Sequence, residues 1–173
     1  MKTLAIVFAV LLLTGCGREE LPDPNLPIDQ YVQAISKSIE SVEVNKLLYD
    51  QHGQPISKPS YYVTAVLKFD FFWGDAQDWN GLASKVSYIA RPAFERPELA
   101  RLRFKVVDKS GADWAYVDLR RYKFPAGWKD LSYLEQFAVL DVDGGYIQSN
   151  QALCEFYHKY ESAQPKGWKG CQP

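Results

Sequence analysis

The sequence contains few of the residues on which metal and catalytic sites usually depend. Its 173 residues include two histidines, three cysteines and one methionine, Met1. These side chains are common ligands of transition metals, so we expect no metal site and no cofactor. Positive and negative charges nearly balance, with 20 Lys and Arg against 21 Asp and Glu. Because a nucleic-acid-binding protein needs a basic excess, the balance argues against nucleic acid as a partner.

The short motifs of common catalytic and nucleotide sites are also missing. No Gly-x-Ser-x-Gly, Ser-x-x-Lys or glycine-rich phosphate loop follows the N-terminal segment. Glu155 and His158 have the spacing of a metal-carboxylate bundle, but that site needs two such pairs. Asp141–Gly144 is similar to the start of a calcium loop, but its twelfth position is Ala152 where glutamate is required. We interpret the first as a helical ion pair and the second as a strand end followed by a turn.

The N-terminus carries the clearest signal. Lys2 precedes ten apolar residues, Leu4–Leu13, too few for a membrane span of about 20 residues but typical of a secretory signal. The run ends in Leu13-Thr14-Gly15-Cys16, which resembles the lipobox of bacterial lipoproteins. The resemblance implies cleavage before Cys16, acylation of Cys16 and, because Gly17 stands where Asp would retain the protein in the inner membrane, transport to the outer membrane. The alternatives are an ordinary signal peptide or a buried helix.

This interpretation divides the chain into three parts: a signal peptide at residues 1–15, an acylated N-terminus with a proline-rich tether at 16–28, and a globular domain at 29–173. The acyl chains would hold the domain at the membrane. Export also favours a disulfide between the two remaining cysteines, Cys154 and Cys171. Two free, buried thiols are the alternative.

Periodicity predicts an α+β domain with an antiparallel sheet of about five strands and helices packed on one face. Alternating apolar residues from Tyr61 to Trp73 predict a long strand with one buried side. The other elements are a helix capped by Asp29 with its apolar stripe running to Val42, a β-like stretch at 41–49, a turn at 50–55, a helix from Asp75 or Asp78 to Pro92, a hairpin at 101–122, a turn at 124–128, a helix at 131–138, a strand at 137–142 and a last helix from Ser149 or Asn150.

The hairpin at 101–122 has two possible registers. A three-residue loop with Gly111 in the left-handed conformation places Leu102, Phe104 and Val106 on one face with Trp114 and Tyr116. A two-residue loop instead places Arg101 opposite Asp118 and Arg103 opposite Tyr116. We favour the Gly111 loop, because its turn chemistry is better.

Two groups of residues are candidates for partner binding. The first is the local basic cluster, which comprises Arg101, Arg103, Lys105, Arg120 and Arg121. The second is Trp128 and Trp168, which stand beside Gly and Lys in predicted loops, where exposed aromatic rings would anchor a partner. The alternatives are a charged strand that discourages edge pairing and rings that belong to the core.

The sequence therefore predicts a non-catalytic, lipid-anchored lipoprotein of the cell envelope, with a periplasm-facing domain that binds or assembles with a partner. The partner would be an envelope protein or a cell-wall glycan. One alternative is an immunity or inhibitor lipoprotein. The other is a small hydrolase of peptidoglycan or polysaccharide, whose carboxylates would come from Asp70, Asp118 or Asp141.

Overall fold

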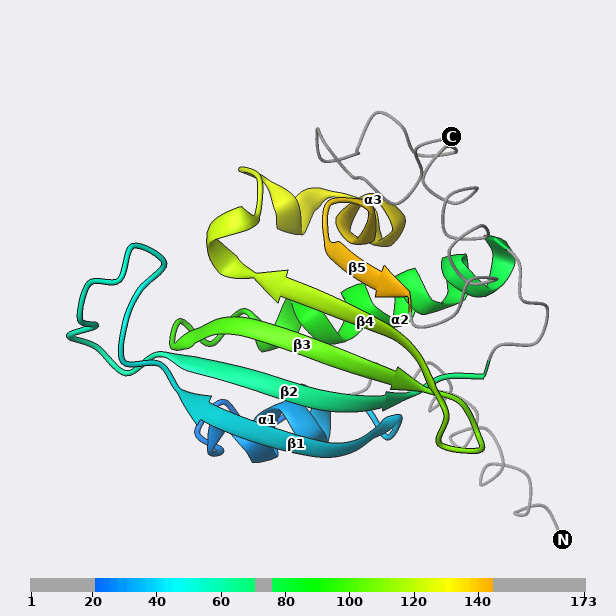
Figure 1. The fold of residues 1–173 in the computed structure, drawn as a ribbon, viewed down its shortest axis with the longest axis horizontal. Coiled ribbons are helices and arrows are strands. Elements are labelled where there is room, and N and C mark those ends of the chain that lie inside the picture. Colours follow the sequence, from blue (N-terminus) through cyan, green and yellow to red (C-terminus); the bar gives the residue numbers. More distant parts are fainter. Residues whose placement is uncertain (1–20, 71–75, 145–173) are drawn as a thin grey trace, which may run out of the picture.

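The structure is a computed structural model that describes residues 21–70 and 76–144. Three α-helices, five strands and two 3-10 turns follow one another in this part of the chain (Figure 1). Their bounds are α1 Ile28–Ile35, β1 Ile39–Lys46, β2 Tyr61–Lys68, α2 Ala76–Ala93, β3 Leu99–Val107, β4 Asp113–Arg120, η1 Arg121–Lys123, η2 Trp128–Asp130, α3 Tyr133–Ala138 and β5 Asp141–Gly144.

The five strands form one mixed sheet in the order β1-β2-β3-β4-β5. Neighbours are antiparallel except β2 and β3, which are parallel. The α+β prediction is confirmed, but the prediction of a fully antiparallel sheet is wrong. The reason is α2, whose 18 residues span about 27 Å, close to the length of an eight-residue strand, so it returns the chain to the end where β2 began.

The hydrophobic core lies on one face of this sheet. Val63, Ala65 and Leu67 of β2 are fully buried, and the inward positions of β3 and β4 continue the same layer. Both longer helices pack their buried residues into this cluster, and Figure 1 shows α1 behind β1 and α2 behind β3 and β4. The face of the sheet turned away from α1 and α2 is called the outer face below.

Two predicted helix boundaries are wrong. The first helix ends at Ile35 because Ser36 is extended, so Ile39 and Val42 belong to β1. The predicted cap, Asp29, lies in the first turn, while Pro27 occupies the N-cap position without a side-chain hydrogen bond.

The second helix was predicted with its correct buried face. Trp79, Leu82, Ala83, Val86, Ile89 and Ala90 are at most 1% exposed. Of the two predicted caps, Asp78 lies inside the first turn and Asp75 lies outside the described residues. Pro92 lies in the last turn, one residue before the end. The carbonyl of Pro92 accepts a hydrogen bond from the Tyr31 hydroxyl at 3.2 Å, which joins the two helices.

The strand predicted from Tyr61 to Trp73 ends at Lys68, and its last residues lie outside the described part. The turn at 50–55 and the helix at 131–138 are confirmed, the latter as α3 with a capping box between Ser132 and Glu135. The predicted strand at 137–142 is displaced to Asp141–Gly144, because Phe137 still belongs to α3.

The tight turn of the β3–β4 hairpin has the geometry that Gly111 predicts. Gly111 has a φ of +84°, and the Asp108 amide donates to the Ala112 carbonyl at 3.0 Å. The Asp108 carboxylate accepts hydrogen bonds from the amides of Ser110 and Ala112. A hydrogen bond from the Ser110 hydroxyl, supported by these amide contacts, lowers the pKa of Asp108 to about 2.

Beyond the turn, neither predicted register holds. A bulge between Val106 and Val107 shifts the pairing by one residue, so Phe104 lies opposite Val117 and Leu102 opposite Leu119. The predicted face with Trp114 and Tyr116 is therefore wrong. The shift places apolar side chains opposite one another on the buried face. The stability gained from this packing outweighs the regular strand pairing that would otherwise follow the turn.

We expect Gly111→Ala to lower the free energy of unfolding by about 1 kcal/mol, because the left-handed conformation is unfavourable for a residue with a Cβ. No atom lies within 4 Å of the added Cβ, so backbone strain is the only cost. Urea denaturation measures the loss. Gly111→Asn should lose less, since Asn tolerates this conformation; equal losses for both variants would contradict the explanation.

Candidate functional site

The predicted basic cluster lies mainly on the outer face of the sheet. Arg101, Arg103 and Lys105 occupy alternate positions of β3, between the buried residues of that strand. Arg120 lies opposite Arg101 on β4. The fifth member, Arg121, is separate: its guanidinium donates to the carbonyls of Phe94, Arg96 and Leu99 and ties η1 to the start of β3.

One carboxylate organises this cluster. Arg101 donates from Nε to Asp118 Oδ1 at 2.6 Å and from Nη2 to Oδ2 at 2.7 Å. Arg120 Nε also donates to Asp118 Oδ2, at 2.8 Å. Burial alone would raise the pKa of Asp118, but the hydrogen bonds and charges of the two arginines hold it below its ordinary value. Asp118 therefore fixes both guanidinium groups in place.

Arg103 is placed differently from its neighbours. It lies opposite Asp118 in the strand register, yet its guanidinium sits over the Tyr116 ring, 4.7 Å from the centroid. Its Nε is buried and makes no hydrogen bond, and no ion pair joins it to a carboxylate among the described residues. Arg103 is therefore held by its contact with the Tyr116 ring rather than by one of these ion pairs.

Lys105 is neutralised within the sheet. Its Nζ lies 2.8 Å from Asp113 Oδ1, and the Tyr116 hydroxyl donates to Asp113 Oδ2 at 2.7 Å. The positive charges of the outer face nearest the start of β3 are thus those of Arg101, Arg103 and Arg120.

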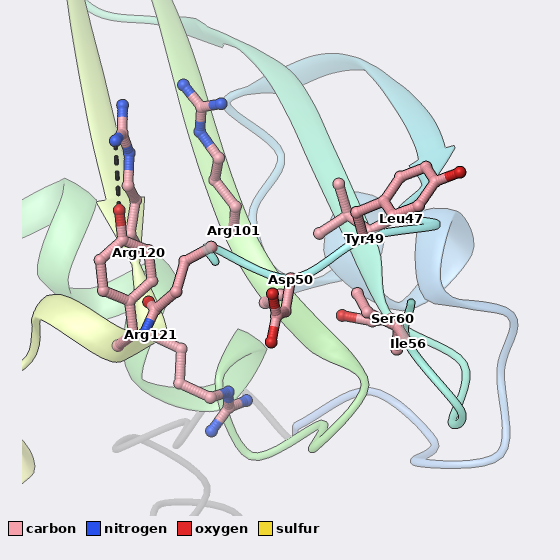
Figure 2. A pocket seen from close by; sticks show the side chains of 11 residues that line it. Leu47, Tyr49, Asp50, Ile56, Ser60, Arg101, Arg120 and Arg121 are labelled. Carbon is pink, nitrogen blue, oxygen red and sulfur yellow. Dashed lines mark hydrogen bonds between the residues drawn. The ribbon is translucent and has the colours of Figure 1, made fainter. Parts of the chain in front are cut away.

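A pocket of about 470 Å³ opens beside Arg101 and Arg120 at one end of the sheet (Figure 2). The connection between β1 and β2 forms one wall, and the start of β3 with the residues after β4 forms the other. We call it the Arg-Tyr pocket. Its lining includes Leu47, Tyr49, Ile56, Ala100, Arg101, Arg120 and Tyr122. This volume is within the range of small-ligand and peptide side-chain sites.

Two tyrosines frame the Arg-Tyr pocket. Tyr49 is 61% exposed and Tyr122 is 55% exposed, and the Tyr122 hydroxyl accepts a hydrogen bond from Arg120 Nη1 at 3.3 Å. Figure 2 shows Arg101 and Arg120 extending in the same direction from neighbouring strands, with Tyr49 across the pocket and Arg121 pointing the other way. The pocket thus combines aromatic rings with positioned guanidinium groups.

The wall formed by the β1–β2 connection is held by its own hydrogen bonds. The Leu47 amide donates to the Ser60 carbonyl and the Ile56 amide to the Leu48 carbonyl. At the tip, Asp50 Oδ1 accepts from the amides of His52 and Gln54, which lowers the pKa of Asp50. These contacts fix the position of Tyr49 relative to the sheet.

Trp128 does not belong to this surface. It was predicted to be exposed, but it is 3% exposed and stacks on Phe124 with ring centroids 4.2 Å apart. Its indole Nε1 donates to the Gln136 carbonyl at 3.2 Å. The prediction of an exposed ring is therefore wrong, because Phe94, Phe124 and Gln136 pack against it from both sides of the sequence.

Several predicted residues lie outside the described part of the chain. They are Cys16, the last predicted helix with its caps Ser149 and Asn150, the pair Glu155 and His158, Trp168, and the predicted disulfide partners Cys154 and Cys171.

Of the three carboxylates considered for hydrolysis, Asp70 lies apart from the other two, which are on neighbouring strands. Asp70 forms an ion pair with Lys109 at 3.1 Å, near the β3–β4 turn. Asp118 and Asp141 face each other in the register of β4 and β5. In each described carboxyl group whose pKa is shifted, the pKa is lowered, whereas a general acid needs a raised pKa.

Among residues 21–70 and 76–144, no group of three potential metal ligands is close enough to hold an ion.

Comparisons with protein-family models, with curated proteins and with solved structures find no match to this chain. No helix in the described residues is long and apolar enough to cross a membrane.

Sequence reasoning missed both tyrosines of the pocket and the apolar residues that line it, Leu47, Ile56 and Ala100. Tyr49 and Tyr122 are 73 positions apart in the chain, so no local pattern connects them. The one available signal was Leu48 and Tyr49 directly before a predicted turn, because large apolar residues beside a turn are candidates for an exposed patch.

Proposed function

We propose that this protein is a lipid-anchored envelope lipoprotein whose domain faces the periplasm and binds or assembles with a protein partner through the Arg-Tyr pocket. The observation that carries the binding role is the pocket itself, where two exposed tyrosines flank two positioned arginines. Tyrosine and arginine are enriched at the energetic centres of protein interfaces. The anchor rests on the resemblance of Leu13–Cys16 to a lipobox, and the outer-membrane location rests on Gly17.

The arrangement of charges supports binding over catalysis. Asp118 has a lowered pKa and is occupied by Arg101 and Arg120, so it lacks the proton that a general acid must supply at neutral pH. Arginines held by a carboxylate lose little conformational freedom when they bind a ligand, which favours affinity.

One observation favours the alternative of a small hydrolase. Asp118 and Asp141 face each other in register across β4 and β5, which places two carboxyl-bearing residues at adjacent backbone positions. Release of soluble fragments from purified cell wall, with Asp118→Asn as the inactive control, would support this alternative.

The test is photo-crosslinking in cells. We expect the full chain with a benzophenone amino acid at Tyr122 to capture one protein partner in stoichiometric amounts. The same probe at Tyr88, which is 37% exposed on α2, should not, because α2 packs against the opposite face of the sheet. Mass spectrometry identifies the product, and an inhibitor role follows if the partner is an enzyme that the protein blocks.

Equal capture from Tyr122 and Tyr88 would contradict the proposed site. Capture of cell-wall fragments alone, detected by their loss after wall digestion, would contradict the protein partner and identify a glycan in its place.

A further inference from the structure

The charges of the outer face are distributed unevenly across its strands. Three guanidinium groups, those of Arg101, Arg103 and Arg120, belong to β3 and the end of β4, and Asp118 binds two of them. Asp141 and Asp143 lie on β5, opposite Asp118 and Tyr116, so their backbones are two strands from that of Arg103, about 10 Å away. The positive charge therefore lies toward β3, on the side of the pocket, and the acidic residues of β5 lie on the other side.

The spacing of these charges along β3 is defined by the strand. Arg101 and Arg103 are alternate residues, so their Cα atoms are about 6.6 Å apart. Carboxylates on alternate residues of an extended peptide repeat at the same distance. Each guanidinium also has five donors, of which Arg101 uses two on Asp118. Donors on Arg101 thus remain for a further acceptor.

From this geometry we infer that the partner segment in the Arg-Tyr pocket is an extended acidic peptide with carboxylates on alternate residues, an inference that rests on the proposed binding function. An apolar or aromatic side chain enters the pocket between Tyr49 and Tyr122. The first carboxylate meets Arg101 and Arg120 at the mouth of the pocket. The second meets Arg103 over the Tyr116 ring.

The surroundings favour a peptide over a phosphate polymer. The chain as a whole carries a formal charge of -1, so it lacks the broad positive field by which nucleic-acid-binding proteins attract phosphates. The positive charges on this side of the outer face belong to three side chains, of which Arg101 and Arg120 line the pocket. Such a pairing of an apolar anchor with a few fixed charges suits a short protein segment.

The test uses fluorescein-labelled peptides and the full chain purified in detergent. The probe has one tyrosine followed by two glutamates separated by one serine. A second peptide has the same composition with adjacent glutamates, and a third has glutamines in their place. In fluorescence anisotropy we expect the first to bind most tightly, the second more weakly and the third least. Equal binding of the three peptides would overturn the inference.

Arg103 supplies the decisive variant. Arg103→Gln should weaken binding of the alternating probe about tenfold, the loss typical of a charge-assisted hydrogen bond. Arg103→Lys should lose less affinity than Arg103→Gln, because it keeps the positive charge. It should still lose some affinity, because lysine lacks the planar guanidinium group. Lys109→Gln is the matched control, since Lys109 is 69% exposed at the hairpin turn, the other end of the sheet.

Thermal unfolding of each variant verifies the fold. Binding by Arg103→Gln as tight as that of the unsubstituted chain would overturn the inference. If this happens while Tyr122 still crosslinks a protein partner in cells, the proposed function stands and only the acidic segment is excluded.

Discussion

Trp128→Ala is expected to lower the free energy of unfolding by about 3–5 kcal/mol, the range for removing a buried large aromatic side chain. Trp128 packs against Phe124 and against Phe94, whose ring centroid is 6.3 Å away at a steep angle. Its indole also bonds to the Gln136 carbonyl, while Gln136 Nε2 donates to the Trp128 carbonyl at 2.9 Å. Removing the ring leaves a cavity beside Phe94 and Phe124 and leaves the buried carbonyl of Gln136 without its hydrogen-bond donor. Urea denaturation measures the loss.

Trp128→Phe is the matched variant for this experiment. It keeps most of the apolar volume but removes the indole N–H, so we expect a loss of about 1–3 kcal/mol from the unsatisfied carbonyl of Gln136. Binding of the acidic probe to the folded protein should be unchanged in both variants. Normal stability with lost binding would instead show that the ring is a surface anchor.

The sequence predicted well those elements whose pattern is local and strongly periodic. The buried stripe of α2 and the alternation of β2 follow from spacing alone, because each places one continuous face against the core. Trp128 could not be assigned in this way. Its burial depends on Gln136 and Phe94, which reach it only after α2 and α3 have packed together.

The sheet shows a second limit of sequence reasoning. The turn at Gly111 was predicted from its residues, but the bulge at Val106 and Val107 depends on which side chains of β4 fit the core. The parallel pairing of β2 and β3 likewise depends on the path of α2 across the sheet. Local turn chemistry cannot specify either feature, since both are decided by packing across the whole layer.

Only part of the candidate site could be predicted, for the same reason. The basic residues were recognisable as a cluster because Arg101, Arg103 and Lys105 alternate along one arm of the predicted hairpin and Arg120 and Arg121 end the other. The pocket was not, because it forms only where the β1–β2 connection meets the residues after β4. The sequence thus indicated the charge of the site, whereas the fold supplies its shape.

Asp118→Asn is the second change with a large expected effect. The Asp118 side chain is 11% exposed, whereas those of Arg101 and Arg120 are about a third exposed. Breaking a fully buried ion pair costs about 3–5 kcal/mol. Solvent screens the partly exposed arginines, so we expect a loss of about 2 kcal/mol at pH 7. Repulsion among Arg101, Arg103 and Arg120, no longer offset by Asp118, is the physical cause.

The pH dependence of this loss distinguishes charge from packing. The folded-state pKa of Asp118 lies below its ordinary value of 3.8, so its carboxylate stabilises the fold fully above that value and loses this effect as the pH falls through the folded pKa. The difference in unfolding free energy between the unsubstituted chain and Asp118→Asn should therefore be largest at pH 7 and shrink below pH 3.8. Urea denaturation at pH 7, 4 and 3 measures it. A difference that stays constant over this range would assign the loss to the shape of the amide and would remove Asp118 as the electrostatic centre of the site.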